Sequence, residues 1–280
     1  MTMLRSSLLL CGAALGLSAC ATVPAPIEVR APAPAVSASA ELAALFRASD
    51  EANLKRNPLQ ALARGDMRYA DRLGEYFTEE SYAAERTAAQ AELAALARID
   101  RAALTPSERV SYDTFKWQRE MDLRGLSEPL LGTSKLLPLN HFYGLHTSFS
   151  ELSSGEGIAP YKTLADYENG LKRVPDFERA IDQAIVRFRE GAAAGVVQPR
   201  LVMENVLGQL DAMLAGPVEQ SSFYQPLTRF PDTIAEPDRA RLRAAYTQMI
   251  ATRIRPALTR LRDYIRSDYL PRSRATVGLA

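Results

Sequence analysis

Helical periodicity is the feature that most constrains how this chain can fold. Beyond residue 41, apolar residues recur three or four positions apart. No segment alternates between apolar and polar residues for long enough to predict a strand. The cleanest stripe consists of Phe177, Ile181, Ala184, Ile185 and Phe188 and ends near Gly191. We therefore predict an all-α fold, a multi-helix array in which these stripes form the core.

Proline and threonine residues predict where the first helices begin and end. A first helix should end at Pro58, and Thr78 should cap a second, Ala-rich helix that runs to about Ile99. The predicted buried face of the first helix carries Leu42, Leu45, Phe46 and Ser49.

A capping box predicts the start of the next helix. In Thr105-Pro106-Ser107-Glu108 the threonine and the glutamate are spaced to cap each other's backbone amides, and proline occupies the first helical position. The apolar residues that follow at helical spacing are Val110, Thr114, Trp117 and Met121. We predict that this stripe is buried.

Further prolines divide the C-terminal part of the chain into helices. Thr163 should cap a helix that Pro175 kinks or breaks, Pro199 should open another, and Pro237 should begin a long one. Pro256 lies inside this last helix and removes one backbone donor, so a bend is expected there. The residues expected to face the core are Val202, Val206, Leu210 and Met213 or Leu214, followed by Leu242, Tyr246, Met249, Ile250, Leu258, Leu261 and Ile265.

The N-terminus reads as a secretion signal. Arg5 precedes a short apolar run, residues 8–17, which is too short for a membrane span. The stretch Leu17-Ser18-Ala19-Cys20 resembles the bacterial lipobox, which implies a signal peptide over residues 1–19 and a lipid on Cys20. The alternative is an ordinary secretory signal with an incidental cysteine. Because Ala21 is not aspartate, the resemblance implies a periplasm-facing lipoprotein of the outer membrane.

Composition limits the chemistry of the mature chain. Residues 20–40 are rich in proline and alanine and should form an extended tether ahead of a helical domain over residues 41–280. Cys11 leaves with the signal and Cys20 carries lipid, so the domain has no thiol for a disulfide, a metal or a nucleophile. A net charge of +1 with interspersed signs predicts no nucleic-acid partner.

The stretch from Leu139 to Gly157 holds both histidines of the chain, His141 and His146. A catalytic zinc ordinarily takes three protein ligands, and no His-Glu-x-x-His motif is present. The alternative is a metal site formed by the two histidines and either Glu151 or Glu156, since these would supply three ligands. No Gly-x-Ser-x-Gly elbow is found either. We expect a loop here, no metal site in this chain and no self-sufficient active site.

Several motifs occur in a characteristic order. They are PLQALARGDMRYADRL (58–73), YKTLADYENGLK (161–172), Arg189-Glu190-Gly191 with Pro199-Arg200, SFYQPL (222–227) and Asp268-Tyr269-Leu270-Pro271. Together they resemble the bacterial family called domain of unknown function 885, whose members are similar to gluzincin zinc metallopeptidases. The resemblance covers about residues 41–280.

The resemblance implies an incomplete enzyme. Family members are longer, and their His-Glu-x-x-x-Gly-His-His zinc motif lies in a C-terminal half that has no counterpart in this sequence. This chain would then be the N-terminal, substrate-cleft half from a truncated gene or gene fragment, with zinc supplied only in the other half.

The same resemblance implies that the loop of Asn140, His141, Tyr143 and His146 lines a substrate cleft and binds peptide backbone. The alternative is that His141 and His146 only satisfy backbone groups of the loop. The expected partners are a membrane, through the lipid, and a peptide substrate. The alternative is a non-enzymatic, lipid-anchored helical binding or scaffold protein of the periplasm.

Overall fold

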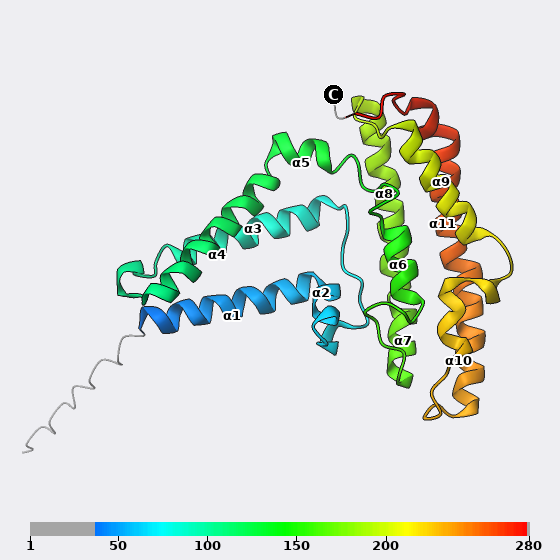
Figure 1. The fold of residues 1–280 in the computed structure, drawn as a ribbon, viewed down its shortest axis with the longest axis horizontal. Coiled ribbons are helices and arrows are strands. Elements are labelled where there is room, and N and C mark those ends of the chain that lie inside the picture. The colour runs from blue at the N-terminus through cyan, green and yellow to red at the C-terminus, as the bar shows by residue number, and fades with distance from the viewer. Residues whose placement is uncertain (1–36, 279–280) are drawn as a thin grey trace, which may run out of the picture. The chain divides into compact units, whose positions relative to one another are not determined.

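The computed structural model describes residues 37–278, which form α-helices, short 3-10 helices and two π-helical turns (Figure 1). Within that range there is no strand, only an isolated bridge between Pro199 and Arg274. The predicted all-α fold is confirmed. The predicted signal peptide, Cys20 and residues 20–36 of the predicted tether lie outside the described residues.

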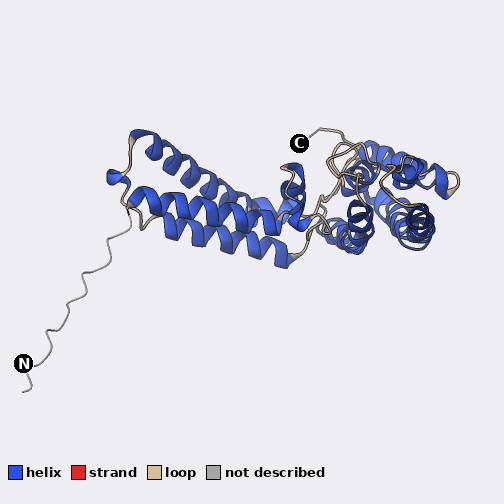
Figure 2. Cartoon of the chain, turned by 90° about the horizontal axis from the view of Figure 1, so that it is seen from below, coloured by secondary structure: helices blue, strands red, loops and turns tan. Residues whose placement is uncertain are grey.

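The first group of helices forms a bundle with its own small core. Its members are α1 (Ala38–Arg56), α2 (Pro58–Ala63), α3 (Glu79–Leu96), α4 (Pro106–Gly125) and α5 (Glu128–Ser134). In both views α1, α3 and α4 run side by side (Figures 1 and 2). Their shared core consists of Leu42, Leu96, Ile99, Leu104 and Tyr112.

Side-chain caps fix where these helices begin. Ser37 caps α1, which begins at Ala38, so the helix starts three residues before the predicted start of the domain at residue 41. Thr78 caps α3, as predicted. Thr105 and Glu108 form the predicted capping box at α4, and the Glu108 carboxylate also accepts a hydrogen bond from Ser39 at 3.0 Å. That contact ties the start of α4 to the start of α1.

The predicted buried face of α4 is wrong. Val110 and Trp117 are 66% and 61% exposed, and Met121 is also exposed. The face that packs against α1 and α3 instead carries Tyr112 and Phe115. Helix α4 therefore has two apolar stripes. The stripe with Tyr112 and Phe115 packs into the core of the bundle, and the stripe with Val110, Trp117 and Met121 is exposed.

The second group of helices builds the main core. Its members are α6 (Leu145–Ser153), α7 (Leu164–Lys172), α8 (Val174–Ala194), α9 (Arg200–Leu214), α10 (Glu236–Met249) and α11 (Arg255–Tyr264). Helix α11 contacts both α8 and α9, while α6 packs on α8 and α7 on α10. The predicted stripe of α8 and all seven predicted core residues of the long C-terminal helix are buried.

Proline residues break or bend the helices of this group as expected, and a π-helical turn precedes Pro256. The chain breaks between α7 and α8, where Pro175 occupies the first turn of α8. Ahead of Pro256 the backbone widens into a π-helical turn, Ile250–Ile254, in which the Arg255 amide donates to the Ile250 carbonyl five residues back. Because proline has no amide hydrogen, this shift of the hydrogen-bond register lets the helix continue with a bend.

One helix inside the predicted loop was missed. Residues Leu145–Ser153 form α6, whose Leu145, Phe149 and Leu152 are buried at helical spacing. The Phe149 ring stacks on Phe177 of α8 with centroids 4.2 Å apart. Burial of this short stripe stabilises a helix that a Gly- and Ser-rich sequence would not form alone.

The segment between α2 and α3 is held by side chains of the second helical group. Arg173, which is buried, donates from Nη1 to the Ala70 carbonyl at 2.5 Å. The Asp176 carboxylate accepts from the Leu73 amide at 2.9 Å. These bonds join positions 103 residues apart in the sequence.

No helix within residues 37–278 has both the length and the apolar character needed to cross a membrane.

Candidate ligand-binding cleft

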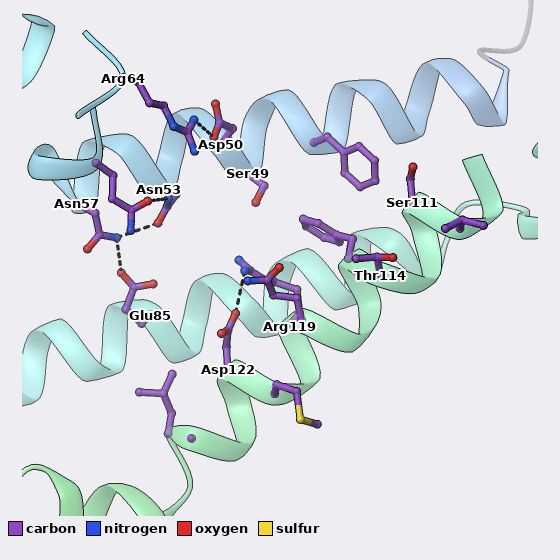
Figure 3. A pocket seen from close by; sticks show the side chains of 18 residues that line it. Ser49, Asp50, Asn53, Asn57, Arg64, Glu85, Ser111, Thr114, Arg119 and Asp122 are labelled. Atoms are coloured by element: carbon purple, nitrogen blue, oxygen red, sulfur yellow. Dashed lines mark hydrogen bonds and ion pairs between the residues drawn. The ribbon is translucent and has the colours of Figure 1, made fainter. Parts of the chain in front are cut away.

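A cleft of about 1040 Å³ opens between α1, α2, α3 and α4 (Figure 3). One wall comes from the C-terminal half of α1 and from α2, and the opposite wall comes from α4. Figure 3 shows polar side chains from both walls pointing into the space between the helices.

Three side-chain amides form a hydrogen-bonded ladder on the α1–α2 wall. Asn57 Nδ2 donates to Asn53 Oδ1 at 2.8 Å and to Glu85 Oε1 at 3.2 Å. Asn53 Nδ2 donates to Gln60 Oε1 at 2.9 Å. The direction of these bonds orients the amides. It leaves the Gln60 amide nitrogen and the Asn57 amide oxygen without a partner among residues 37–278.

The local sequence explains how the ladder forms. Asn53 and Asn57 are four residues apart, so their side chains lie on the same face at the end of α1. Asn57 leaves the helical conformation with φ −119° and ψ 70°, because a residue that precedes proline disfavours it. Pro58 then starts α2, and the chain turns so that Gln60 reaches Asn53.

The charges that line the cleft are all paired. Asp50 meets Arg64 at 2.6 Å. Glu85 meets Arg56 at 3.1 Å. Arg119 of α4 bridges two carboxylates, Glu92 at 3.0 Å and Asp122 at 2.9 Å. The cleft therefore offers a ligand no uncompensated charge.

The α4 wall is partly apolar. The rings of Phe46 and Phe115, which both line the cleft, pack with centroids 5.0 Å apart. The exposed side chains of Val110 and Met121 line it as well. Trp117 does not line the cleft, but it lies on the same face of α4, seven residues after Val110 and four before Met121.

The side chains of the cleft suit binding better than catalysis. A general base for neutral pH is most often a histidine, and neither histidine lines this cleft. The three carboxylates that do line it, Asp50, Glu85 and Asp122, are held in ion pairs. An amide ladder facing an apolar wall can hold a polymer that has both hydrogen-bonding and apolar groups.

The loop predicted to line a substrate cleft lies elsewhere and is rigidly held. The Asn140 carboxamide oxygen accepts from the amides of Phe142 and Tyr143, both at 2.8 Å. The Asn140 amide donates to the Tyr143 carbonyl at 2.8 Å. Phe142 and Tyr143 are 75% and 78% exposed. The loop thus presents two aromatic side chains to solvent.

The two histidines do not share a site with Tyr143. His146 lies on α6 and is fully buried, with Nε2 3.0 Å from Gln209 Oε1. Gln209 in turn donates to the His141 carbonyl at 2.9 Å. The expectation that Tyr143 and His146 face one cleft is therefore wrong for the His146 side chain. Neither the cleft between α1 and α4 nor either of two further hollows, one beside Tyr76 and one beside Ile158, is lined by Asn140, His141, Tyr143 or His146.

The surroundings of His146 do not fit a zinc ion. Its Nε2 atom is engaged by Gln209, and Nδ1 lies so close to Gly144 that a β-carbon there would be 2.4 Å away. Across residues 37–278 no three histidine, cysteine, aspartate or glutamate side chains are grouped so that they could hold a metal. The alternative site with Glu151 or Glu156 therefore does not form.

The cleft residues were missed at the level of sequence, although one signal was available. Asparagine is unfavourable inside helices, because its side chain competes for backbone hydrogen bonds. Two asparagines four residues apart, directly before Pro58, stand out in a helix that is otherwise rich in alanine and leucine.

Comparison with known proteins gives a family and a fold. Residues 58–279 match the family described as "Bacterial protein of unknown function (DUF885)". The crystal structure of "the putative lipoprotein from Colwellia psychrerythraea" is similar, with a TM-score of 0.70 and 14% identity over 87% of this chain. At that identity the likeness shows the fold alone. This chain spans 43% of the length of that protein. No curated protein matches the chain.

Proposed function

This chain belongs to the bacterial DUF885 family, and from that membership we propose that its helical domain binds polypeptide substrates. In this proposal it is the substrate-cleft half of a metallopeptidase-like hydrolase and is held at the outer membrane by lipid on Cys20. The single observation that carries the proposal is the cleft between α1 and α4, with its amide ladder and apolar wall.

The chemistry of the cleft supports a polypeptide ligand. An extended peptide carries amide donors and acceptors along its backbone and apolar groups on its side chains. The free amide atoms of Gln60 and Asn57 can pair with backbone groups, while Phe115, Val110 and Met121 can cover side chains. The ionic groups of the cleft are already paired with one another. An uncharged ligand therefore has the smallest free-energy cost of desolvation on entering the cleft.

Hydrolysis is assigned to groups outside this chain. The donors around His146 do not fit zinc, and the cleft carboxylates are held by arginines. In this proposal the domain binds and orients the substrate, and the family's zinc-bearing half would act on it. The purified domain alone should therefore bind peptide without cleaving it.

The lipid anchor would place this cleft close to a membrane. Its support is the Leu17-Ser18-Ala19-Cys20 motif and the proline-rich stretch before α1. The similar structure from Colwellia psychrerythraea is described as that of a "putative lipoprotein". Each buried CH₂ of an acyl chain contributes about 0.8 kcal/mol, so two or more chains on one cysteine would anchor firmly.

The test measures binding and cleavage in the same sample. Residues 21–280 are mixed with fluorescein-labelled casein peptides, and anisotropy and mass spectrometry are recorded. We expect saturable binding, no new fragments and no stoichiometric zinc. Asn53→Ala and Gln60→Ala should weaken binding several-fold, whereas Gln90→Ala, an exposed glutamine of α3 outside the cleft, should not. Binding unaffected by the ladder variants, or chelator-sensitive cleavage by wild type, would contradict the proposal.

A second candidate is a non-enzymatic scaffold or binding protein. The observation that favours it is the loop pinned by Asn140, which exposes Phe142 and Tyr143. Rigid exposed aromatics contribute strongly to protein interfaces, because little conformational freedom is lost when they are covered. If Phe142→Ser with Tyr143→Ser abolished capture of a periplasmic partner and peptide binding to the cleft were absent, this candidate would replace the first.

A further inference from the structure

We infer that the cleft between α1 and α4 selects uncharged, apolar stretches of polypeptide, and that the stripe of Val110, Trp117 and Met121 on α4 is the surface that makes the selection. This inference rests on the proposed function and adds the class of substrate. It concerns the preference of the cleft, which can be measured separately from binding itself.

The stripe on α4 is continuous with the cleft. Val110 and Met121 line the cleft directly, as does Phe115. Trp117 continues the same helical face beyond the rim. A polypeptide lying along the cleft would cover this stripe, which the bundle itself leaves exposed.

The charged side chains of the cleft favour a neutral ligand. The five ionisable side chains that line the cleft are Asp50, Arg64, Glu85, Arg119 and Asp122, and each has an oppositely charged partner within 3.1 Å. A charged ligand group would have to break one of these pairs or enter without a partner. An uncharged segment avoids both costs, so the electrostatics of the cleft complement a neutral ligand.

The exposed apolar side chains of α4 favour a ligand with apolar groups. Covering apolar surface stabilises a complex in proportion to the area removed from water. Val110 lines the cleft and is 66% exposed, and Trp117, which lies on the same face of α4 outside the cleft lining, is 61% exposed, so a ligand that extends past the rim can cover both side chains. A leucine or phenylalanine placed there gains this contribution, whereas a serine does not.

The experiment uses the only tryptophan of the chain as its reporter. Three acetylated and amidated nonapeptides share a Gly-Ser framework and carry three leucines, three serines or three lysines. Each is titrated into residues 21–280 while Trp117 emission and peptide anisotropy are measured. We expect the leucine peptide to bind at least tenfold more tightly than the other two and to shift Trp117 emission to the blue.

Matched variants assign the preference to the stripe. The double variant Val110→Ser with Met121→Ser should bind all three peptides about equally. Val186→Ser changes a partly exposed valine on α8, away from the cleft, and should keep the preference. Both sets of substitutions are at exposed positions, and circular dichroism of each variant checks that it has folded.

The outcomes separate this inference from the proposed function. Failure of all three peptides to bind would overturn the proposed function and this inference with it. Equal binding of the three peptides by wild type would leave the peptide-binding function standing and overturn the selection. Tighter binding of the lysine peptide would overturn it as well, because it would reveal an uncompensated acidic group in the cleft.

Discussion

Arg187 donates from Nε to the carbonyl oxygen of Phe77 at 2.7 Å, across 110 positions of the chain. Phe77 has a φ of 66° and is the only non-glycine residue with a positive φ within residues 37–278. For a bulky side chain this left-handed conformation is unfavourable. The buried guanidinium of Arg187 therefore stabilises a strained residue in the segment that leads into α3.

Loss of this contact should destabilise the domain. Arg187→Ala removes the donor to Phe77 and the ion pairs of Arg187 with Glu79 at 2.9 Å and Glu190 at 2.8 Å. We expect the free energy of unfolding to fall by about 1–3 kcal/mol, mainly because the Phe77 carbonyl loses its charged donor. Urea unfolding followed by circular dichroism measures the change.

The control is an exposed arginine. Arg98→Ala, near the end of α3, should change stability by less than about 0.5 kcal/mol. An equal loss in the two variants would contradict a specific role for Arg187.

Two glycines inside helices predict opposite effects of the same substitution. A β-carbon on Gly170 of α7 would lie 2.2 Å from the Tyr246 hydroxyl of α10, which donates to the Tyr167 carbonyl at 2.7 Å. Gly170→Ala should therefore cost about 1–3 kcal/mol through overpacking. Gly208 of α9 has no atom within 4 Å of that position, so Gly208→Ala should stabilise by up to about 1 kcal/mol. Thermal melts of the two variants test the contrast, and a gain in stability for Gly170→Ala would refute the close approach of α7 and α10.

The helices that sequence predicted well are those with both a long apolar period and a local start signal. Thr78, Thr105 and Thr163 each cap the helix that they were expected to cap, because capping depends only on residues within one turn. The stripe of α8 was likewise unambiguous, since only one face of that helix is apolar.

The errors have a common physical origin in tertiary packing. Helix α4 carries two apolar stripes, and which of them is buried depends on where α1 and α3 lie, so its sequence alone favoured the wrong one. Helix α6 was missed because glycines and serines flank it, and it forms by packing Phe149 on α8.

The candidate cleft was beyond sequence reasoning for the same reason. It requires Asn53 and Asn57 of α1 to face Arg119 of α4, and no local pattern specifies that approach.

Lipid attachment makes a prediction that can be tested in cells. Cys20→Ser removes the thiol that would form the thioether, so the protein should move from the membrane fraction to the soluble fraction. Cys11→Ser is the matched control, because Cys11 lies in the predicted signal peptide and should not affect anchoring. Mass spectrometry of the mature wild type should show acylated Cys20. A mature N-terminus at another residue would contradict the prediction.

The buried His146 predicts how stability depends on pH. Gln209 uses its amide nitrogen to bind the His141 carbonyl, so its oxygen faces His146 and accepts from Nε2. Histidine is then neutral, with the lone pair on the buried Nδ1, which has no hydrogen-bond partner among the described residues. Burial lowers the pKa of His146 below its ordinary value of 6.5, although the bond to Gln209 opposes this shift.

The free energy of unfolding should fall as the pH is lowered, because the folded and unfolded chains bind a proton on His146 with different affinities. Below pH 6.5 the unfolded chain takes up a proton on this side chain more readily than the folded chain does. The stabilising contribution of neutral His146 is therefore complete above pH 6.5 and is lost as the pH falls through the folded pKa. The loss can reach about 1.4 kcal/mol per pH unit for a single proton.

Chemical unfolding at pH 8, 6.5 and 5.5 measures this loss in wild type and in two variants. His146→Gln keeps a polar side chain of similar size but cannot titrate, so its stability should decline less between pH 6.5 and 5.5 than that of wild type. His141→Gln changes the other histidine and should retain the full decline. If wild type and His146→Gln lost stability in parallel, another group would be responsible, and the neutral, buried state of His146 would not control the acid sensitivity of the domain.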